Sequence, residues 1–455
     1  MNRLPQPLLD KLAEIYPREQ LFTDPVDCYA YAYDNARTMT PPQAVAFAIN
    51  AKQIRETVIA CNEYRVPLTP RGRGTGTAGG SVPVMGGIVL SLERMRRGVA
   101  IDPDNRVAIA EAGMLNREVQ EAALPHGLFW PPDPSSADYC SIGGNLATCA
   151  GGPHAVKYGV ARDHVLGLRA VTGTGALIKT GCYTTKGVVG YDLTRLIVGS
   201  EGTLAVITEA TLKLSPLPRA RAGITAHYKD PESCAQAIAA IMRASPTPSA
   251  LEFLDEGSLN LLRPRLTIPA ESLALLMIEV DGGEHEVAEA AEIMLSRCEN
   301  SGLISARPAE DAATLWRARK MLSPLLREIA PKKINEDVVV PVSHLPALLA
   351  GLAGIARKQD IAIVNFGHAG NGNLHVNLLV DAGDPDQMRR AKIALSEIFD
   401  LALGLNGTLS GEHGIGSEKR DFVAREIDAE TLDLMQALKR AFDPNNVLNP
   451  GKLFP

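Results

Sequence analysis

The sequence predicts an α+β protein built from two domains. Its 455 residues exceed the size at which a single hydrophobic core keeps growing. Two prolines, Pro216 and Pro218, stiffen and extend the chain near its middle, which is typical of a linker. We therefore predict a boundary near Leu217. The predicted divisions are a first domain over residues 1–217, a second domain over 218–420, and a C-terminal helical segment over 421–455 that returns to the first domain.

The first domain is predicted to contain a β-α-β unit near its start. Apolar residues alternate over 45–49 as in a half-buried strand, recur at helical spacing over 54–61, and form a second extended run over 66–68. From Gly72 to about Thr211 the sequence changes to short β-branched runs separated by Gly and Pro. Long loops between such strands would have to carry the ligand chemistry.

The second domain mixes strands with amphipathic helices. Strand-like runs occur at residues 223–227, 273–280, 361–366 and 374–380, and residues 286–298 have helical spacing. This order predicts an antiparallel sheet flanked by helices.

Composition and charge favour a small-molecule substrate. Apolar residues make up 45% and charged residues 22% of the chain, which is ordinary for a globular protein with a large core. The net charge of −6 and the lack of a Lys and Arg run exclude an electrostatic footprint for nucleic acid. Nucleic-acid partners are therefore not expected.

The N-terminus and the cysteines indicate a cytoplasmic protein. Residues 1–7 lack the apolar core of a signal peptide, and no stretch approaches the ~18 apolar residues of a membrane helix. Peripheral association with an inner membrane is the alternative location. The seven cysteines include no Cys-x-x-Cys pair, so we expect neither disulfides, thiolate metal sites nor iron–sulfur clusters. We interpret them as small buried apolar residues.

A glycine-rich loop over residues 70–80 predicts a diphosphate ligand, because a backbone without Cβ atoms lets amide groups approach phosphate closely. Gly74, Gly76 and Gly79 also match the Rossmann dinucleotide pattern. A Rossmann loop must open a helix, whereas Pro83 and the Gly86-Gly87 pair interrupt the segment that follows. NAD bound in that manner is therefore disfavoured, and a plain surface turn remains the other alternative.

Three further segments carry small and hydroxyl residues suited to a nucleotide: residues 131–145, 151–159 and 198–204. Together with the glycine-rich loop they resemble the FAD-binding domain of vanillyl-alcohol-oxidase type flavoproteins. The Pro-Pro-Asp-Pro-Ser-Ser and Lys-Tyr-Gly-Val stretches resemble the FAD-linked D-2-hydroxy-acid dehydrogenase family. This branch contains the flavin subunit of glycolate oxidase, D-lactate dehydrogenase and D-2-hydroxyglutarate dehydrogenase. The resemblance runs from about Pro41 to the C-terminus, and it implies a two-domain flavoprotein in which the second domain is the cap.

The resemblance also implies the cofactor residues. The FAD pyrophosphate is expected on residues 71–77, and residues 132–145 and 197–203 are expected to line the rest of the cofactor. Cys149 departs from the polar residue that relatives more often carry near the flavin ring. Some members attach FAD covalently to a His or Cys, but the glycine-rich loop has neither, so we expect non-covalent FAD. The candidate cofactor residues are Arg71, Gly72, Arg73, Gly74, Thr75, Gly76, Thr77, Pro132, Ser135, Ser141, Gly143, Gly144, Asn145, Gly151, Gly152, Tyr158, Gly159, Glu201, Gly202 and Ile207.

A second polar cluster predicts a metal site. The Gly and Asn content of residues 369–373 is typical of a hairpin turn, which would bring His375 back beside His368. Asn377 lies on the same strand face as His375, two residues away, and is a candidate substrate ligand. Two neutral imidazoles completed by a carboxylate suit Zn²⁺ or a similar divalent ion. Two hydrogen-bonded structural histidines are the alternative.

The segment Ser410-Gly411-Glu412-His413-Gly414 presents an acid and an imidazole side by side between glycines. Glu412 is the candidate third metal ligand and His413 the candidate base, since an imidazole pKa of ~6.5 suits proton abstraction near neutral pH. The resemblance implies the same roles and an Arg that holds the substrate carboxylate. Arg319 is the candidate, with Arg317 as competitor on another helix face, and the charged groups of residues 332–335 are interpreted as solvated.

We therefore predict an FAD-dependent enzyme that oxidises a D-2-hydroxy acid to the 2-oxo acid. His413 removes the hydroxyl proton, and hydride passes from Cα to flavin N5. An external electron acceptor is expected: oxygen, a quinone, a carrier protein or an iron–sulfur subunit. A homodimer is the assembly expected if the chain associates with itself. The alternatives are an FAD oxidase of another alcohol and a flavin subunit that is active only within a multi-subunit complex.

Overall fold

The computed structural model describes residues 3–309 and 312–455, and the chain divides into two compact units. The first unit comprises Met1–Gly151, Gly159–Leu217 and Glu412–Pro455, and the second comprises Gly152–Tyr158 and Pro218–Gly411. Within the described ranges, no helix is both long enough and apolar enough to cross a membrane.

These divisions differ from the sequence-based ones at two places. The chain re-enters the first unit at Glu412 and not after residue 420, because the backbone N–H groups of Ile415 and Gly416 donate to the Glu201 carboxylate. Residues 152–158 belong to the second unit, where Lys157 and Tyr158 both hydrogen-bond to Asp281. Side-chain contacts far apart in the sequence thus decide both differences.

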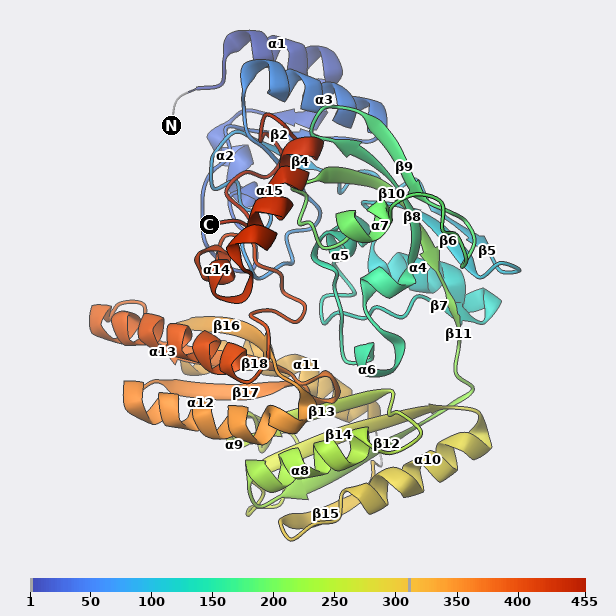
Figure 1. Ribbon diagram of the computed structural model, residues 1–455, viewed down its shortest axis with the longest axis vertical. Helices are drawn as coiled ribbons and strands as arrows, with labels where there is room; N and C mark the ends of the chain where they lie inside the picture. Colours follow the sequence, from blue (N-terminus) through green and yellow to red (C-terminus); the bar gives the residue numbers. More distant parts are fainter. Residues whose placement is uncertain (1–2, 310–311) are drawn as a thin grey trace. The chain divides into compact units, whose positions relative to one another are not determined.

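The first unit contains three sheets (Figure 1). A four-stranded sheet has the order β1-β2-β4-β3, a five-stranded antiparallel sheet has the order β5-β6-β10-β8-β9, and β11 pairs with β7. The strands are β1 (Leu21–Phe22), β2 (Ala44–Phe47), β3 (Leu68–Arg71), β4 (Ile88–Ser91), β5 (Val99–Asp102), β6 (Val107–Glu111), β7 (Leu128–Phe129), β8 (Val165–Thr172), β9 (Leu177–Gly181), β10 (Ala205–Lys213) and β11 (Ser215–Pro216). The helices are α1 (Gln6–Ile15), α2 (Pro25–Cys28), α3 (Ala51–Tyr64), α4 (Asn116–Ala123), α5 (Ile142–Thr148), α7 (Leu193–Ile197), α14 (Val423–Glu426) and α15 (Ala429–Phe442).

The predicted β-α-β unit is confirmed as β2, α3 and β3. Helix α3 begins where the Asn50 side chain accepts a hydrogen bond from the Gln53 N–H, and its buried face includes Ile54, Val58 and Cys61. Strands β2 and β3 both run parallel to β4. The glycine-rich loop follows β3 and leads directly to β4 without an intervening helix, so the Rossmann arrangement is excluded, as predicted.

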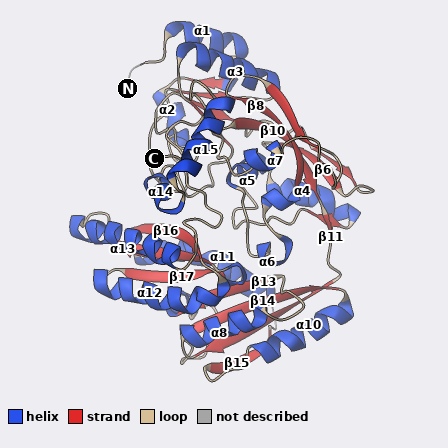
Figure 2. Ribbon diagram, in the orientation of Figure 1, coloured by secondary structure: helices blue, strands red, loops and turns tan. Residues whose placement is uncertain are grey.

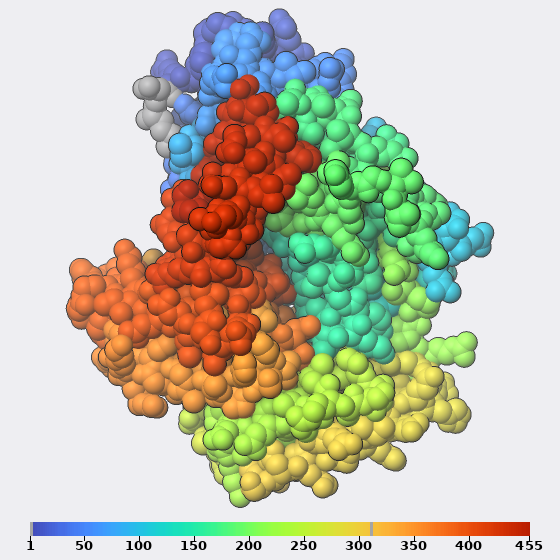
Figure 3. All heavy atoms as spheres, viewed as in Figure 1, coloured from blue at the N-terminus to red at the C-terminus, as the bar shows by residue number. Residues whose placement is uncertain are grey.

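The C-terminal segment packs into the first unit. The buried Lys439 of α15 donates to the backbone carbonyls of Thr203 and Leu448. Asn449 donates to the carbonyls of Gly80 and Glu201, which braces the far side of the glycine-rich loop. In Figure 3 the red atoms of this segment lie against blue and green atoms of the same unit.

The second unit is built on a seven-stranded antiparallel sheet with the order β15-β12-β14-β13-β17-β18-β16 (Figure 2). Its strands are β12 (Ala220–Tyr228), β13 (Ala250–Asp255), β14 (Ala274–Gly282), β15 (Leu303–Pro308), β16 (Lys332–Val339), β17 (Ala362–His368) and β18 (Asn373–Val380). Its helices are α6 (Ala155–Tyr158), α8 (Pro231–Met242), α9 (Glu256–Leu262), α10 (Glu284–Arg297), α11 (Ala312–Ile329), α12 (Leu345–Gln359) and α13 (Pro385–Gly404). The predicted antiparallel sheet flanked by helices is thus confirmed.

Two layers of helices cover this sheet. Helices α8, α10, α12 and α13 pack on one face, and α9 and α11 on the other. Apolar residues of α9 and α11, such as Leu259 and Leu322, share a core with Leu254, Met277 and Phe366 of the strands. The candidate polar residues lie on this second face, beside that core.

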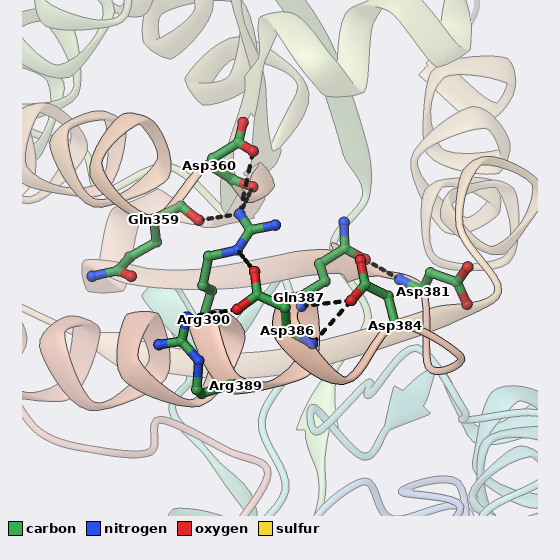
Figure 4. A network of polar contacts seen from close by, with 8 residues as sticks. All are labelled: Gln359, Asp360, Asp381, Asp384, Asp386, Gln387, Arg389 and Arg390. Atoms are coloured by element: carbon green, nitrogen blue, oxygen red, sulfur yellow. Dashed lines mark hydrogen bonds and ion pairs between the residues drawn. The ribbon is translucent and has the colours of Figure 1, made fainter.

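A polar network fastens two helices of the first layer to each other (Figure 4). The Arg390 guanidinium of α13 donates to the carbonyls of Gln359 and Asp360 at the end of α12, at 2.5 and 2.6 Å, and to Asp386 one turn away. Asp384 caps the start of α13. The network satisfies carbonyls at a helix C-terminus and is structural.

All seven cysteines are free thiols. Five are buried as predicted, whereas Cys149 and Cys182 are partly exposed. Cys149 ends α5 in the left-handed region (φ +54°), which places it at the turn that follows the helix.

Candidate functional site

In the first unit, the glycine-rich loop lies against the start of α5. A Cβ atom added to Gly72 would lie 2.3 Å from Ser141 Oγ and 3.8 Å from Gly144 Cα. Ser141 caps α5 by accepting a hydrogen bond from the Gly144 N–H. The structure therefore brings together two of the segments that the sequence identified as nucleotide-binding, and a side chain at residue 72 would displace the Ser141 hydroxyl that caps α5.

Unpartnered buried polar atoms mark the same region. Thr77 Oγ1, Asn145 Nδ2 and Ser200 Oγ are buried and make no hydrogen bond within the described part of the chain. A buried polar atom left unpaired costs about 1–3 kcal/mol, so such atoms are expected where a ligand completes the bonding. One lies in each of the three segments predicted to hold the cofactor. The residues present therefore fit a nucleotide cofactor rich in hydroxyl and phosphate groups.

Other candidate cofactor residues support the loop itself. The buried Arg71 guanidinium donates to Ser81 and lies over the Tyr31 ring, 5.5 Å from its centroid. Pro132 is buried, and its carbonyl accepts from Asn116, whereas the Ser135 side chain is exposed. Arg71 and Pro132 thus shape the loops through their own protein contacts.

Three candidate cofactor side chains are engaged elsewhere. Glu201 is buried, which raises its carboxyl pKa, and both carboxylate oxygens accept backbone N–H groups at 2.7 Å. Tyr158 donates its hydroxyl to Asp281 of the second unit at 2.8 Å, and Gly152 also belongs to that unit. The Ile207 side chain is part of the first unit's core. Their spacing in the sequence carried no information about these distant partners.

Gly76 gives a test of the cofactor position. A Cβ atom at Gly76 meets nothing within 4 Å, so we expect Gly76→Val to fold like the parent and to lose bound FAD, because the added side chain would occupy the space of the pyrophosphate. Flavin absorbance after gel filtration measures retention. Gly74→Val is the contrast, since its Cβ would lie 2.1 Å from the Arg71 guanidinium at a φ of +66° and should lower the Tm. Full flavin occupancy in Gly76→Val would place the cofactor elsewhere.

In the second unit, the predicted hairpin brings two histidines together. Strands β17 and β18 are antiparallel neighbours joined by a short 3-10 turn, η6 (Ala369–Asn371). The rings of His368 and His375 lie with centroids 5.2 Å apart at an interplanar angle of 86°. The prediction that the turn folds His375 back beside His368 is confirmed.

Glu412 completes a possible ligand set. Ligand atoms of His368, His375 and Glu412 all lie within 4.8 Å of one another. Glu412 directly follows Gly411, whose N–H is held by the carbonyl and carboxylate oxygens of Asp337 at 2.9 Å each. Two imidazoles and one carboxylate match the donor set of a catalytic zinc site, which keeps a position open for substrate. The residues present therefore fit a divalent metal ion.

Sequence reasoning missed Glu252, the residue beneath this cluster. It is fully buried on β13, opposite His368 on β17. One carboxylate oxygen lies 2.5 Å from His368 Nδ1, and the other accepts from Arg319 Nε at 2.6 Å. Burial alone would raise the pKa of Glu252, but the charges and hydrogen bonds of His368 and Arg319 outweigh it and lower the pKa to about 2. The sequence did contain a sign of this role, because Glu252 is an acidic residue within the apolar run Ala-Leu-Glu-Phe-Leu of residues 250–254.

The two candidate arginines of α11 face different surroundings. The Arg319 side chain is almost buried, and its guanidinium lies 4.5 Å from the centroid of the Phe366 ring. Its terminal nitrogens make no hydrogen bond to the described residues. Arg317 is exposed and donates to Thr314. Only Arg319 thus has free donors beside the histidine pair.

The buried Asn377 has an amide oxygen that is unpartnered among the described residues. It is fully buried, and its amide nitrogen donates to the carbonyls of Val364 and His375, so Oδ1 makes no hydrogen bond within the described residues. Asn335 lies opposite it on β16, and its buried Oδ1 is likewise unpartnered there. Lys333 was interpreted as solvated, but its ammonium group donates to Ser323 Oγ of α11 at 2.6 Å. This correction comes from the pairing of strand and helix.

A second buried acid, Glu279 on β14, serves the structure of the second unit. Its carboxylate accepts from Trp316 of α11 at 2.9 Å and contacts His154 Nε2 at 3.0 Å. It is one strand away from Glu252 and almost as buried, yet its carboxylate hydrogen-bonds to His154, Ser249 and Trp316 and to none of the three candidate metal ligands. Glu279 therefore provides a matched comparison for Glu252.

His413 sits in a segment held at both ends. Gly411 before it is fixed by Asp337, and Ile415 after it is fixed by Glu201. Gly414 adopts a positive φ of +83°, which a residue with a side chain would rarely accept. His413 as a whole is partly exposed, whereas its Nδ1 atom is buried.

Comparisons with known proteins identify the class. Residues 42–181 match the family described as "FAD binding domain", and residues 217–453 match "FAD linked oxidases, C-terminal domain". The fold resembles p-cresol methylhydroxylase, with a TM-score of 0.79 and 17% identity over 98% of this chain and 96% of that one. It also resembles alkyldihydroxyacetonephosphate synthase, with a TM-score of 0.76 and 18% identity over 98% and 85% of the two chains. The predicted vanillyl-alcohol-oxidase type fold is confirmed, and the class is that of FAD-linked oxidoreductases.

Proteins similar in sequence identify the family within this class. The chain is 40% identical to glycolate oxidase subunit GlcD of Bacillus subtilis over 93% of its own length and 92% of that protein. It is 34% identical to glycolate oxidase subunit GlcD of Escherichia coli K12, over 91% and 84% of the two chains. It is 31% identical to D-lactate dehydrogenase of Anaerostipes hadrus, over 99% and 98%. The chain belongs to the FAD-linked oxidase family that contains these enzymes.

Proposed function

We propose that this protein oxidises a D-2-hydroxy acid to the corresponding 2-oxo acid with FAD as cofactor. The observation that carries the proposal is the shared carboxylate of Glu252, which joins a metal-type ligand set to an arginine with free donors. A 2-hydroxy acid carries a carboxylate next to its hydroxyl, so it has the two groups that such a site would bind. The names of the relatives, glycolate oxidase and D-lactate dehydrogenase, support the same substrate class.

Each site residue has a proposed part. Arg319 binds the substrate carboxylate and fixes its orientation, and His413 accepts the proton of the substrate hydroxyl. Asn377 binds a donor group of the substrate, because its unpartnered Oδ1 atom can only accept a hydrogen bond. His368, His375 and Glu412 would hold a divalent ion, proposed to be zinc, which supplies Lewis acidity that makes a hydroxyl easier to deprotonate. FAD, when bound in the first unit, supplies the acceptor for the hydride from Cα. A separate quinone, carrier protein or iron–sulfur subunit then takes the electrons.

Bleaching of the flavin absorbance tests the proposal. The purified protein, saturated with FAD and zinc, is mixed anaerobically with a panel of D- and L-2-hydroxy acids and with alcohols that lack a carboxylate. We expect bleaching by D-2-hydroxy acids and none by the simple alcohols. Bleaching by simple alcohols at comparable rates would favour the alternative, an oxidase of another alcohol with a structural histidine cluster.

A second candidate is a flavin subunit that works only within a larger complex. The name "subunit" of the glycolate oxidase relatives favours it. Dye reduction by the purified single chain separates the two, because a self-sufficient dehydrogenase passes electrons to a dye, whereas an obligate subunit requires its partners.

Arg319→Lys is expected to weaken substrate binding far more than Arg317→Lys. Lysine retains the charge but loses the planar fork that binds a carboxylate through two bonds. A hydrogen bond to a charged group contributes about 1.5–3 kcal/mol, so KM should rise roughly tenfold or more for Arg319→Lys. The exposed Arg317 should tolerate the same change. Equal KM values for the two variants would contradict the role of Arg319 in binding the substrate carboxylate.

A further inference from the structure

The Glu252 carboxylate is shared between two groups with different proposed tasks. Its Oε1 atom lies 2.5 Å from His368 Nδ1, and its Oε2 atom accepts from Arg319 Nε. The residue is fully buried, so these oxygens are shielded from bulk water. His368 is 116 residues away in the sequence and Arg319 is 67 away, so the contact is purely tertiary.

The bond to His368 decides which ring nitrogen faces the metal. A carboxylate accepts a hydrogen bond from Nδ1–H, and the neutral ring then presents the lone pair of Nε2. Metal-binding histidines are typically oriented by such an outer carboxylate, and its loss costs about 10–100-fold in metal affinity. Glu252 has the position and the chemistry of this outer partner.

The bond to Arg319 orients the guanidinium. With Nε held by Glu252 and the plane lying over the Phe366 ring, rotation of the guanidinium is restricted. The terminal nitrogens are left to meet an incoming carboxylate with little further loss of side-chain entropy. One side chain on β13 therefore constrains both groups.

We propose that Glu252 is a positioning residue that couples the metal site to the substrate-carboxylate site by holding His368 and Arg319 on one buried carboxylate. This inference rests on the proposed function, because it uses the roles given there to the metal and to Arg319. A substitution at Glu252 is therefore expected to change metal binding and substrate-carboxylate binding together. A merely structural ion pair would instead contribute to stability alone, as we expect for Glu279.

Zinc affinity and substrate KM, measured on matched variants, test the inference. Glu252→Gln preserves the shape of the side chain, but its single carbonyl oxygen can accept from only one of the two donors. Glu279→Gln is the control, since it makes the same change in a buried acid on the neighbouring strand. Arg319→Lys removes the guanidinium while leaving Glu252 beside His368.

We expect three different patterns. Glu252→Gln should weaken zinc binding by about 10–100-fold, measured by competition with a chromophoric chelator, and should also raise KM when KM is measured at saturating zinc. Arg319→Lys should raise KM with little change in zinc affinity. Glu279→Gln should lower the Tm and change neither quantity. Parental zinc affinity and KM in folded Glu252→Gln would overturn the inference.

Two additions keep the test decisive. Glu252→Asp retains the charge and is expected to fold, but its shorter side chain cannot reach both donors, so zinc affinity or KM should still change; parental values for both would overturn the inference. His368→Gln reports on the proposed function itself. If His368→Gln binds zinc as tightly as the parent, the metal assignment fails; if only the Glu252 variants match the parent, the metal assignment stands and the coupling fails.

Discussion

Replacing His413 by Asn is expected to slow flavin reduction by about 10²–10⁴-fold, the usual contribution of a positioned general base. Asparagine is close to histidine in size and polarity but cannot accept a proton near neutral pH. Anaerobic stopped-flow measurement of flavin bleaching by the best substrate of the panel gives the rate directly.

The His413→Asn variant should otherwise resemble the parent. His413 is not among the three residues whose ligand atoms cluster within 4.8 Å, so zinc content should be unchanged. The variant should also retain FAD, because the unpartnered buried atoms in the predicted cofactor segments lie on Thr77, Asn145 and Ser200. A variant that reduces flavin at the parent rate would refute the role of His413 as base.

Replacing Glu412 by Gln is expected to lower metal content and activity together. The amide keeps the size of the side chain but removes the negative charge that completes the set with His368 and His375. The loss of zinc affinity should exceed the roughly 10–100-fold that removal of an outer-shell partner costs. Elemental analysis and chelator competition measure the metal, and excess zinc should restore part of the activity.

Glu418→Gln is the control for Glu412→Gln. Glu418 lies six residues further on, is exposed, and accepts a hydrogen bond from Thr38, so its change should leave metal and activity unaltered. If Glu412→Gln keeps its zinc and turns over normally while only its Tm falls, the histidine and glutamate cluster is structural. Glu412 and His413, adjacent in the chain, should thus separate into a variant that loses metal and a variant that keeps it but transfers the proton slowly.

The successful predictions rest on local patterns. The Gly and Asn content of residues 369–373 predicted a tight turn, and a tight turn between two strands places His368 and His375 side by side. Pro83 and the Gly86-Gly87 pair excluded a helix after the glycine-rich loop, because proline and glycine both disfavour a helix interior. The alternation of apolar residues identified β2 and β3, and helical spacing identified α3. Both patterns depend only on residues that are close together in the sequence.

The sequence by itself therefore determined the class of fold, the hairpin and the chemistry of the candidate groups, since backbone preference and side-chain functional groups are local properties. Only the tertiary structure decided that residues 152–158 belong to the second unit, that Glu201 holds the segment after His413, and that Glu252 links His368 to Arg319. These contacts join residues 67 to 214 positions apart. Which buried donor meets which buried acceptor depends on how strands and helices pack, because burial forces each charge to find whatever partner the packing brings within reach.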